Sequence, residues 1–321
     1  MEYTQRTRLK GAVSIALAAF FLSGCKMAVL DPQGQIGAQE KTLIIVATVL
    51  MLLVVLPVIG MTLAFAWKYR ATNTKATYAP NWSHSNRIEA VVWAVPCAII
   101  LTLGIITWKT SHTLDPWKPI DTVAGAPAAK PIEVDVVALD WKWLFIYPQQ
   151  RVASVNELAF PVGTPVHFNI TSDSVMNSFF IPQLGSQVYA MAGMQTQVNL
   201  VAEKAGDYAG MSANFSGPGF SDMKFTARAV SQADFDKWVA RAQASTNVMN
   251  FDAYNELSKP SERTPVAYYS GVEPLLYATV LDKYMDKVSD PKLAGRLCLP
   301  AQRGVAQGTN EKTVATAAVT E

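Results

Sequence analysis

Two long apolar runs near the start of the chain predict helices that cross a membrane. The first covers residues 42–66 and contains no charged residue. The second covers residues 88–108 and contains one acidic residue, Glu89, at its start. Apolar runs of about 20 residues match the hydrocarbon core of a bilayer when they form α-helices. We therefore expect a hairpin with helices over about residues 42–67 and 88–109.

The charges between these runs predict how the hairpin is oriented. Lys68, Arg70, Lys75 and Arg87 stand in the connecting segment, and no Asp or Glu occurs there before Glu89. Loops with an excess of Lys and Arg stay in the cytoplasm. We expect the connecting loop in the cytoplasm, and both ends of the chain in the periplasm, on a bacterial inner membrane.

The chain begins with the features of an exported lipoprotein. Basic residues precede a short apolar run over residues 12–22, as in a signal peptide. Next comes Leu22-Ser23-Gly24-Cys25, which resembles the acylation site of bacterial lipoproteins. We expect residues 1–24 to be a signal peptide and Cys25 to be the lipidated first residue of the mature chain. Residues 25–118 then form a lipid-anchored transmembrane hairpin.

The pattern changes after the second run. Residues 119–131 are rich in Pro, Ala and Gly and predict a linker. Short alternating or aromatic segments then recur between turn residues, which is typical of an antiparallel β-sandwich. The expected strands cover residues 132–136, 141–147, 166–171, 178–181, 197–201, 207–211 and 224–229. We expect an all-β domain over residues 132–230.

Helical spacing follows the β-domain. Ser231 and Asp234 predict the start of a helix whose apolar face carries Phe235 and Trp238. Shorter helical patterns cover residues 251–257 and 273–285. We expect a helical extension over residues 231–290. Residues 291–321 form a polar tail without periodicity, which predicts disorder.

Composition narrows the class of protein. The 321 residues are 50% hydrophobic and 16% charged, which is too apolar for an ordinary soluble protein. The net charge of +2, without a long basic run, excludes a nucleic-acid partner. Cys25, Cys97 and Cys298 are far apart and fit no zinc or disulfide spacing. We expect Cys97 to be a buried packing residue of the second span.

One segment makes the expectation for the β-domain specific. Residues 175–185 read Val-Met-Asn-Ser-Phe-Phe-Ile-Pro-Gln-Leu-Gly. They resemble the cupredoxin domain of the cytochrome oxidase subunit II family, which implies a dinuclear copper centre. In that family a His precedes a Ser-aromatic-x-x-Pro stretch, and a Cys-x-Glu-x-Cys, a His and a Met follow later. Aligned on the turn at residues 206–210, the matching positions here are Asn177, Ser212, Asn214, Ser216, Phe220 and Met223.

These residues predict that the copper centre has been lost. Dinuclear copper needs thiolate and imidazole donors, and of the six positions Met223 alone keeps the family's residue. We expect no cofactor and no metal on this chain, with haems and copper in the catalytic subunit I. The alternative is a copper-binding cytochrome c oxidase subunit II. Such a protein would need a copper site at other residues of the external domain. That domain has no cysteine before Cys298, and its one histidine is His167.

The pattern from the lipoprotein motif through the late helices is most similar to the second subunit of cytochrome bo-type ubiquinol oxidases. Residues 81–86, 141–143 and 215–220 are its most specific parts. The resemblance implies a proton-pumping complex that oxidises ubiquinol and reduces oxygen to water. The implied partners are subunit I, the small membrane subunits III and IV, membrane lipid, and ubiquinol through the complex. Because ubiquinol reaches subunit I through the lipid, a copper relay is dispensable and this chain takes a structural and assembly role.

The expected fold is thus an α+β membrane protein: a two-helix transmembrane hairpin, a copper-free cupredoxin-like sandwich and C-terminal helices. Trp141 is expected to be an aromatic packing residue. A free periplasmic binding lipoprotein is a rival that explains the anchor but not two spanning helices.

With the copper ligands lost, Glu89 is the residue of this chain that we expect to take part in proton transfer. The resemblance places a carboxylate at this position at the mouth of a proton channel into subunit I. The alternative is a capping box, with Asn86 as the N-cap and Glu89 as the third helical residue. Both can hold together. No catalytic residue is expected in this chain.

Overall fold

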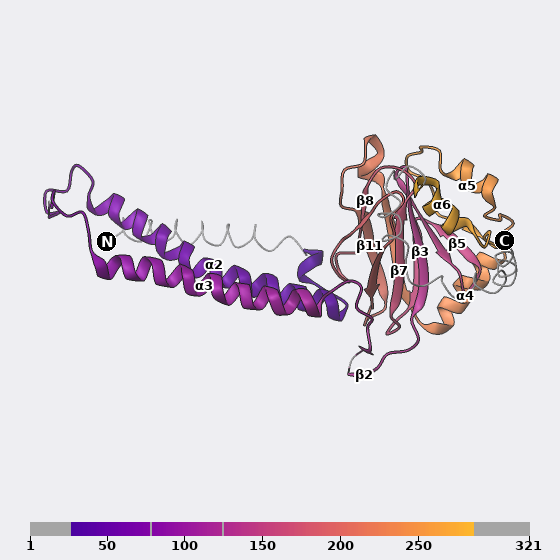
Figure 1. The fold of residues 1–321 in the computed structure, drawn as a ribbon, viewed down its shortest axis with the longest axis horizontal. Coiled ribbons are helices and arrows are strands. Elements are labelled where there is room, and N and C mark those ends of the chain that lie inside the picture. The colour runs from indigo at the N-terminus through magenta and orange to yellow at the C-terminus, as the bar shows by residue number, and fades with distance from the viewer. Residues whose placement is uncertain (1–26, 78, 124, 286–321) are drawn as a thin grey trace, which may run out of the picture.

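The computed structural model describes residues 27–77, 79–123 and 125–285. Two helices project from one end of a β-sandwich, and further helices lie against the sandwich (Figure 1). This is the expected α+β membrane fold. The expected signal peptide, the lipidated Cys25, the C-terminal tail and Cys298 lie outside the described residues.

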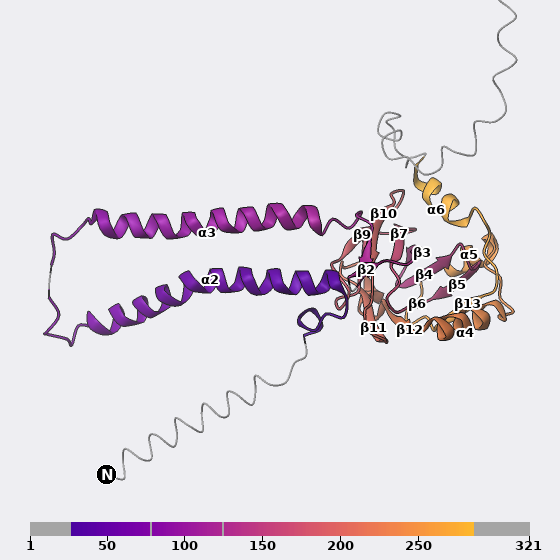
Figure 2. The ribbon, with the colours of Figure 1, turned by 90° about the horizontal axis from the view of Figure 1, so that it is seen from below.

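The hairpin consists of α2 (Gln35–Lys68) and α3 (Asn86–Thr113), and the short 3₁₀ helix η1 (Ala28–Leu30) precedes it. Both helices are long and apolar enough to cross a membrane, with mean hydropathies of 3.0 and 2.3 in an 18-residue window of each. They run alongside each other, away from the domain (Figure 2). Both helices are longer than the apolar runs. In α2, for example, the helix includes the polar residues Gln39 and Lys41, which precede the apolar run.

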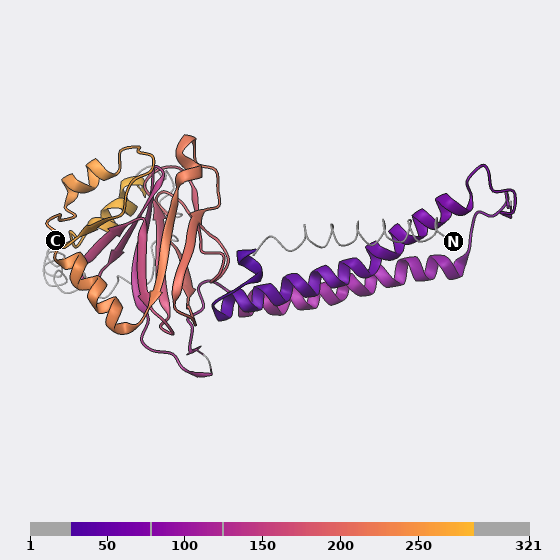
Figure 3. The same ribbon diagram turned by 180° about the vertical axis from the view of Figure 1, so that it is seen from behind.

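The β-domain contains two sheets, which face each other as the layers of a sandwich (Figure 1, Figure 3). Neighbouring strands are antiparallel except for β3 with β7 and β6 with β12. The six-stranded sheet has the order β10 (Thr196–Leu200), β7 (Val166–Ser172), β3 (Ile132–Leu139), β4 (Lys142–Tyr147), β5 (Val152–Val155) and β13 (Ala267–Tyr269). The five-stranded sheet has the order β6 (Glu157–Pro161), β12 (Lys224–Val230), β11 (Gly206–Ser212), β8 (Asn177–Phe180) and β9 (Val188–Ala190).

Strand β4 is buried along its whole length because both faces of its sheet are covered. Trp143 and Phe145 belong to the core between the sheets, where their rings meet phenylalanines of the five-stranded sheet. Leu144 and Ile146 belong to a second core with side chains of α5 (Phe251–Leu257) and α6 (Leu276–Met285). The two cores explain why this strand is apolar at successive positions rather than at alternate ones.

The structure adds strands that the local pattern did not predict. β5, β6 and β9 lie between the expected strands, and β13 lies inside the expected helical extension. β13 pairs with β5 at the edge of the six-stranded sheet. In the expected linker, β1 (Thr122–Val123) pairs with β2 (Ala126–Pro127). Such short strands form because of distant pairing partners, which sequence periodicity does not report.

Helix α4 (Gln232–Gln243) begins where its cap predicts. The Ser231 hydroxyl accepts a hydrogen bond from the backbone N–H of Asp234 at 3.2 Å. Phe235, Trp238 and Ala242 are buried on one face and join the core between the sheets. The expected apolar face therefore attaches this helix to the sandwich.

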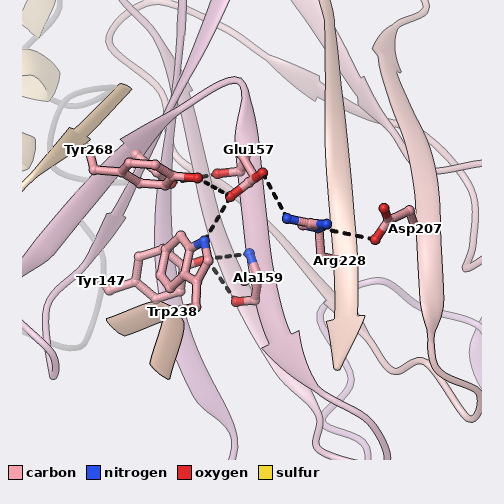
Figure 4. Close-up of polar contacts among 8 residues, drawn as sticks. Tyr147, Glu157, Ala159, Asp207, Arg228, Trp238 and Tyr268 are labelled. Atoms are coloured by element: carbon pink, nitrogen blue, oxygen red, sulfur yellow. Dashed lines mark hydrogen bonds and ion pairs between the residues drawn. The ribbon is translucent and has the colours of Figure 1, made fainter. Parts of the chain in front are cut away.

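A buried carboxylate, Glu157 on β6, connects α4 and β13 to the sandwich (Figure 4). Its Oε1 accepts from the indole Nε1 of Trp238 at 2.8 Å and from the hydroxyl of Tyr268 at 2.5 Å. Its Oε2 lies 3.4 Å from Nη1 of Arg228, and Nε of that arginine lies 3.2 Å from Oδ1 of Asp207. Burial and the neighbouring carboxylate raise the pKa of Tyr268 to about 12, so its hydroxyl remains a donor at neutral pH.

The hairpin is attached closely to the domain. The backbone N–H of Gly37, in the first turn of α2, donates to the carbonyl of Leu184 at 3.0 Å. Gly34 directly precedes the helix, and a Cβ at that position would meet the carbonyl oxygen of Val201. The close approach of the two backbones therefore requires glycine.

Candidate functional site

The positions that match the family's copper ligands lie at the neighbouring ends of β8 and β11 and in the loop that follows β11. In the pairing of β8 with β11, Phe179 stands opposite Ser212. This register places Asn177 beside Ser212, although the two residues are 35 positions apart in the sequence. The loop after β11 continues through the 3₁₀ turn η2 (Pro218–Asp222) toward Met223.

Hydrogen bonds within the protein occupy the polar atoms of this site. The Ser212 hydroxyl donates to Oδ1 of Asn177 at 3.0 Å, and Nδ2 of Asn177 donates to the carbonyl of Val175 at 3.0 Å. Nδ2 of Asn214 donates to the carbonyl of Met176 at 3.0 Å. Asn177 and Ser212 are buried. Their polar groups are therefore satisfied by the protein itself, as buried polar groups must be.

A buried thioether and a pair of aromatic rings stand at the other positions of the site, and Phe215 is 75% exposed, so the aromatic pair lies at the surface. Met223 is 1% exposed, and its Sδ lies 3.9 Å from Oγ of Ser216. The ring of Phe220 meets Phe215 edge to face, with 5.6 Å between the ring centroids. Phe220 offers no donor atom to a metal. The loop thus packs through apolar contacts at a place where the family uses an imidazole.

This donor set does not fit a dinuclear copper centre. Such a centre requires bridging thiolates and imidazole nitrogens, whereas these six positions offer hydroxyls, amides, a phenyl ring and one thioether. Within the described ranges, no group of three or more His, Cys, Asp or Glu residues is placed to hold a metal ion. The loop therefore keeps its fold without the ligands that would give it redox chemistry.

Trp141 closes the site from the β3–β4 turn. Its Nε1 donates to the carbonyl of Ser216 at 3.1 Å. A Cβ at Gly219 would lie 2.5 Å from the indole ring, so glycine is required under the tryptophan. Trp141 has a φ of 63°, a conformation that bulky residues rarely adopt. The packing role predicted for Trp141 is confirmed, and it stabilises the loop after β11.

Glu89 lies in the first turn of α3, which begins at the end of the hairpin remote from the β-domain (Figure 2). Its side chain is 51% exposed, and Oε1 lies 2.5 Å from Nδ1 of His84. The other ring nitrogen of His84 contacts Oδ1 of Asn86. The site is thus an exposed carboxylate paired with an imidazole.

The capping box expected at this helix is wrong. The N-cap is Ser85, which makes no side-chain capping bond, and Asn86 is the first helical residue. Glu89 therefore stands one position too late to reach back to the N-cap. Its carboxylate turns instead to His84, a contact between loop and helix that the local pattern did not predict.

Cys97 is exposed on α3. The expectation that it is buried is therefore wrong for this chain by itself. The apolar run correctly predicts a helix at this position, but the run cannot say which face of the helix another element covers. In this chain, α2 leaves the thiol uncovered.

Comparison with known proteins places the chain in a family. Residues 130–230 match the family "Cytochrome C oxidase subunit II, periplasmic domain", and residues 243–287 match "COX Aromatic Rich Motif". The second match covers α5, β13 and α6, which the sequence pattern had indicated only as helices.

Three relatives show the similarity over most of the chain. Cytochrome bo(3) ubiquinol oxidase subunit 2 of Pseudomonas aeruginosa is 58% identical over 266 residues, which cover 83% of this chain and 79% of the relative. Ubiquinol oxidase subunit 2 of Acetobacter aceti is 54% identical over 280 residues, covering 87% and 90%. Quinol oxidase subunit 2 of Bacillus cereus is 37% identical over 243 residues, covering 75% and 82%. The chain therefore belongs to the cytochrome oxidase subunit II family and, within it, to the group of ubiquinol oxidase subunits 2.

Proposed function

We propose that this chain is the copper-free structural subunit of a proton-pumping complex that oxidises ubiquinol and reduces oxygen to water. The observation that carries the proposal is the former copper loop. Its fold is kept, but hydrogen bonds among Asn177, Ser212 and neighbouring carbonyls stand where the family has metal ligands. A subunit with this loop has no donor set for an electron relay from cytochrome c.

Electron transfer in the proposed complex takes place in the membrane. Ubiquinol is lipid-soluble and reaches the haem-containing subunit I without an external relay. The haems and copper of the reaction belong to that subunit. This chain contributes two helices beside subunit I and a rigid domain over its periplasmic face, with subunits III and IV as further partners.

The proposed location is the bacterial inner membrane, with the β-domain in the periplasm. The basic loop after Lys68 favours a cytoplasmic position for the far end of the hairpin. Acylation of Cys25 with chains such as palmitate adds a second attachment, because each buried CH₂ contributes about 0.8 kcal/mol to membrane binding.

Purification through a tag on this chain tests the main proposal. We expect recovery of a haem-containing membrane subunit together with ubiquinol oxidase activity, and no copper bound to this chain after it is separated from the complex. A chain recovered as a monomer without haem would favour a free binding lipoprotein. Stoichiometric copper on the separated chain would favour a cytochrome c oxidase subunit.

Glu89 is proposed as the entrance carboxylate of a proton channel into subunit I. Its exposure and its contact with His84 support this role, because an exposed carboxylate next to an imidazole can collect protons from water and pass them on. Ionisable groups at a membrane-spanning helix are functional candidates by default. The charge of Glu89 at a helix start also stabilises α3, so the experiment must separate the two effects.

Turnover of the purified complex separates them. Glu89→Ala and Glu89→Gln should slow oxygen consumption and proton uptake while the complex still assembles. Glu89→Asp keeps the carboxylate and should keep both rates. Asp252→Asn is a matched control, because Asp252 is also an exposed carboxylate in the first turn of a helix. Unchanged turnover in Glu89→Ala would leave only the contribution to the helix.

A further inference from the structure

A cavity lies where the hairpin meets the β-domain, and the proposed function does not use it. It encloses about 270 Å³. Its walls come from the first turns of α2, the segment that follows α3, and strands β9 and β10. Figure 2 shows this junction at the point where both helices reach the domain.

Hydrogen bonds hold the walls of this junction cavity in place. Nε2 of Gln35 donates to the carbonyl of Thr122 at 3.1 Å, which joins α2 to the segment after α3. Nδ2 of Asn199 donates to the carbonyl of Pro116 at 3.0 Å, which joins that segment to β10. A ligand would therefore enter a preformed site and lose little affinity to the ordering of the protein.

The cavity lies at the level of the lipid headgroups. The uncharged run of α2 begins at Thr42, directly after Glu40 and Lys41, and Glu40 lines the cavity. Trp108, near the end of α3, is 71% exposed, and tryptophan is enriched at membrane interfaces. Exposed apolar side chains such as Ile44 continue along the helices below this level. An apolar surface on which acyl chains can pack therefore begins one turn of α2 beyond the cavity lining.

The charges around the cavity fit a zwitterion. Its lining includes three carboxylates, on Glu40, Asp115 and Asp121, and one ammonium, on Lys118. Among the ion pairs found in the described ranges, none includes any of these four residues. The Glu40 carboxylate accepts a hydrogen bond from the backbone of Ser186 and keeps further acceptor capacity. An excess of carboxylates favours a bound cation, and the lysine favours a phosphate beside it.

We propose that this cavity binds the headgroup of a phospholipid of the ethanolamine class. The primary ammonium of the headgroup donates to the Glu40 carboxylate, and the phosphate pairs with Lys118. The acyl chains lie along the exposed apolar sides of α2 and α3. A lipid bound in this way fills the space between the hairpin and the domain and contacts both.

Lipid retention in the whole oxidase complex tests the proposal without a mutation. The complex is stripped of lipid in detergent, supplied with equal amounts of phosphatidylethanolamine and phosphatidylglycerol, and analysed by native mass spectrometry. We expect selective retention of the ethanolamine lipid, because the carboxylates repel an anionic headgroup. Equal retention of both lipids, or retention of neither, would overturn the proposal.

Variants then place the lipid in this cavity. Glu40→Gln should lower retention of phosphatidylethanolamine about tenfold, since it removes a charge-assisted hydrogen bond. Glu262→Gln is the matched control, because Glu262 is exposed and lies outside the cavity lining. Equal loss in both variants, or no loss in Glu40→Gln, would contradict the assignment. A carbodiimide cross-link from Glu40 to a lysine of another subunit would show that a protein side chain occupies the cavity instead. If Glu40→Gln does not assemble, the lipid competition on the unmodified complex decides alone.

Discussion

Removing the Glu157 carboxylate should destabilise the β-domain more than any exposed charge on its surface does. The carboxylate is 11% exposed and accepts from an indole N–H and a phenol hydroxyl, while Arg228 approaches its other oxygen. Glu157→Ala leaves the indole N–H and the phenol hydroxyl without this acceptor inside the sandwich, whereas Arg228 keeps its contact with Asp207. A buried donor left without its acceptor costs about 1–3 kcal/mol, and two such donors lose theirs here, so we expect a loss of about 2–5 kcal/mol. That is a large part of the roughly 5–15 kcal/mol that stabilises a domain.

Two further variants divide this effect into its parts. In Glu157→Gln, an amide oxygen can still accept from Trp238 and Tyr268, but the bonds are no longer charge-assisted, so we expect a loss of about 2 kcal/mol. Asp207→Ala is the control, because Asp207 pairs with the same arginine but its side chain is 58% exposed. A surface pair of this kind contributes about 0.2–1 kcal/mol.

The measurement is urea unfolding of the purified chain in detergent, followed by tryptophan fluorescence and circular dichroism. The expected order of unfolding midpoints, from the lowest, is Glu157→Ala, Glu157→Gln, Asp207→Ala and the unmodified chain. The reasoning fails if Glu157→Ala and Asp207→Ala have the same midpoint. In that case burial of the carboxylate does not set the stability of the contacts among α4, β13 and the sandwich.

Two further predictions concern the β-domain. Burial raises the pKa of Asp135 to about 6, above its unfolded value of about 4, so its stabilising contribution is complete below pH 4 and is lost as the pH rises through 6. Asp135→Asn should therefore flatten the fall in urea midpoint between about pH 4 and pH 6.5, and an unchanged fall would assign it to another group. A variant with the family's ligands restored should bind copper, because the backbone already brings the ligand positions together. Bound copper would be measured by metal analysis and by a near-infrared absorption band. A variant that folds but binds no copper would show that the geometry of the loop has changed as well. The restored set is Asn177→His, Ser212→Cys, Asn214→Glu, Ser216→Cys and Phe220→His, with Met223 kept.

The sequence by itself determined the hairpin and the loss of copper ligands. A membrane-spanning helix depends on the length of a single apolar run, which can be read along the chain without knowledge of distant partners. The identities of Ser212 and Ser216 are likewise sufficient to exclude thiolate ligands, wherever the loop lies. The start of α4 was also predictable, because the Ser231 cap is a contact between near neighbours.

Only the tertiary structure decided the features that depend on contacts between distant residues. β13 forms because β5 offers a free edge, and Glu157 becomes a central acceptor because α4, β12 and β13 converge on it. The same limit applies near the membrane. The sequence indicated that Glu89 is a first-turn carboxylate, but the loop geometry determined that it pairs with His84 and not with the N-cap. Such contacts depend on where the chain returns in space, which a one-dimensional pattern does not contain.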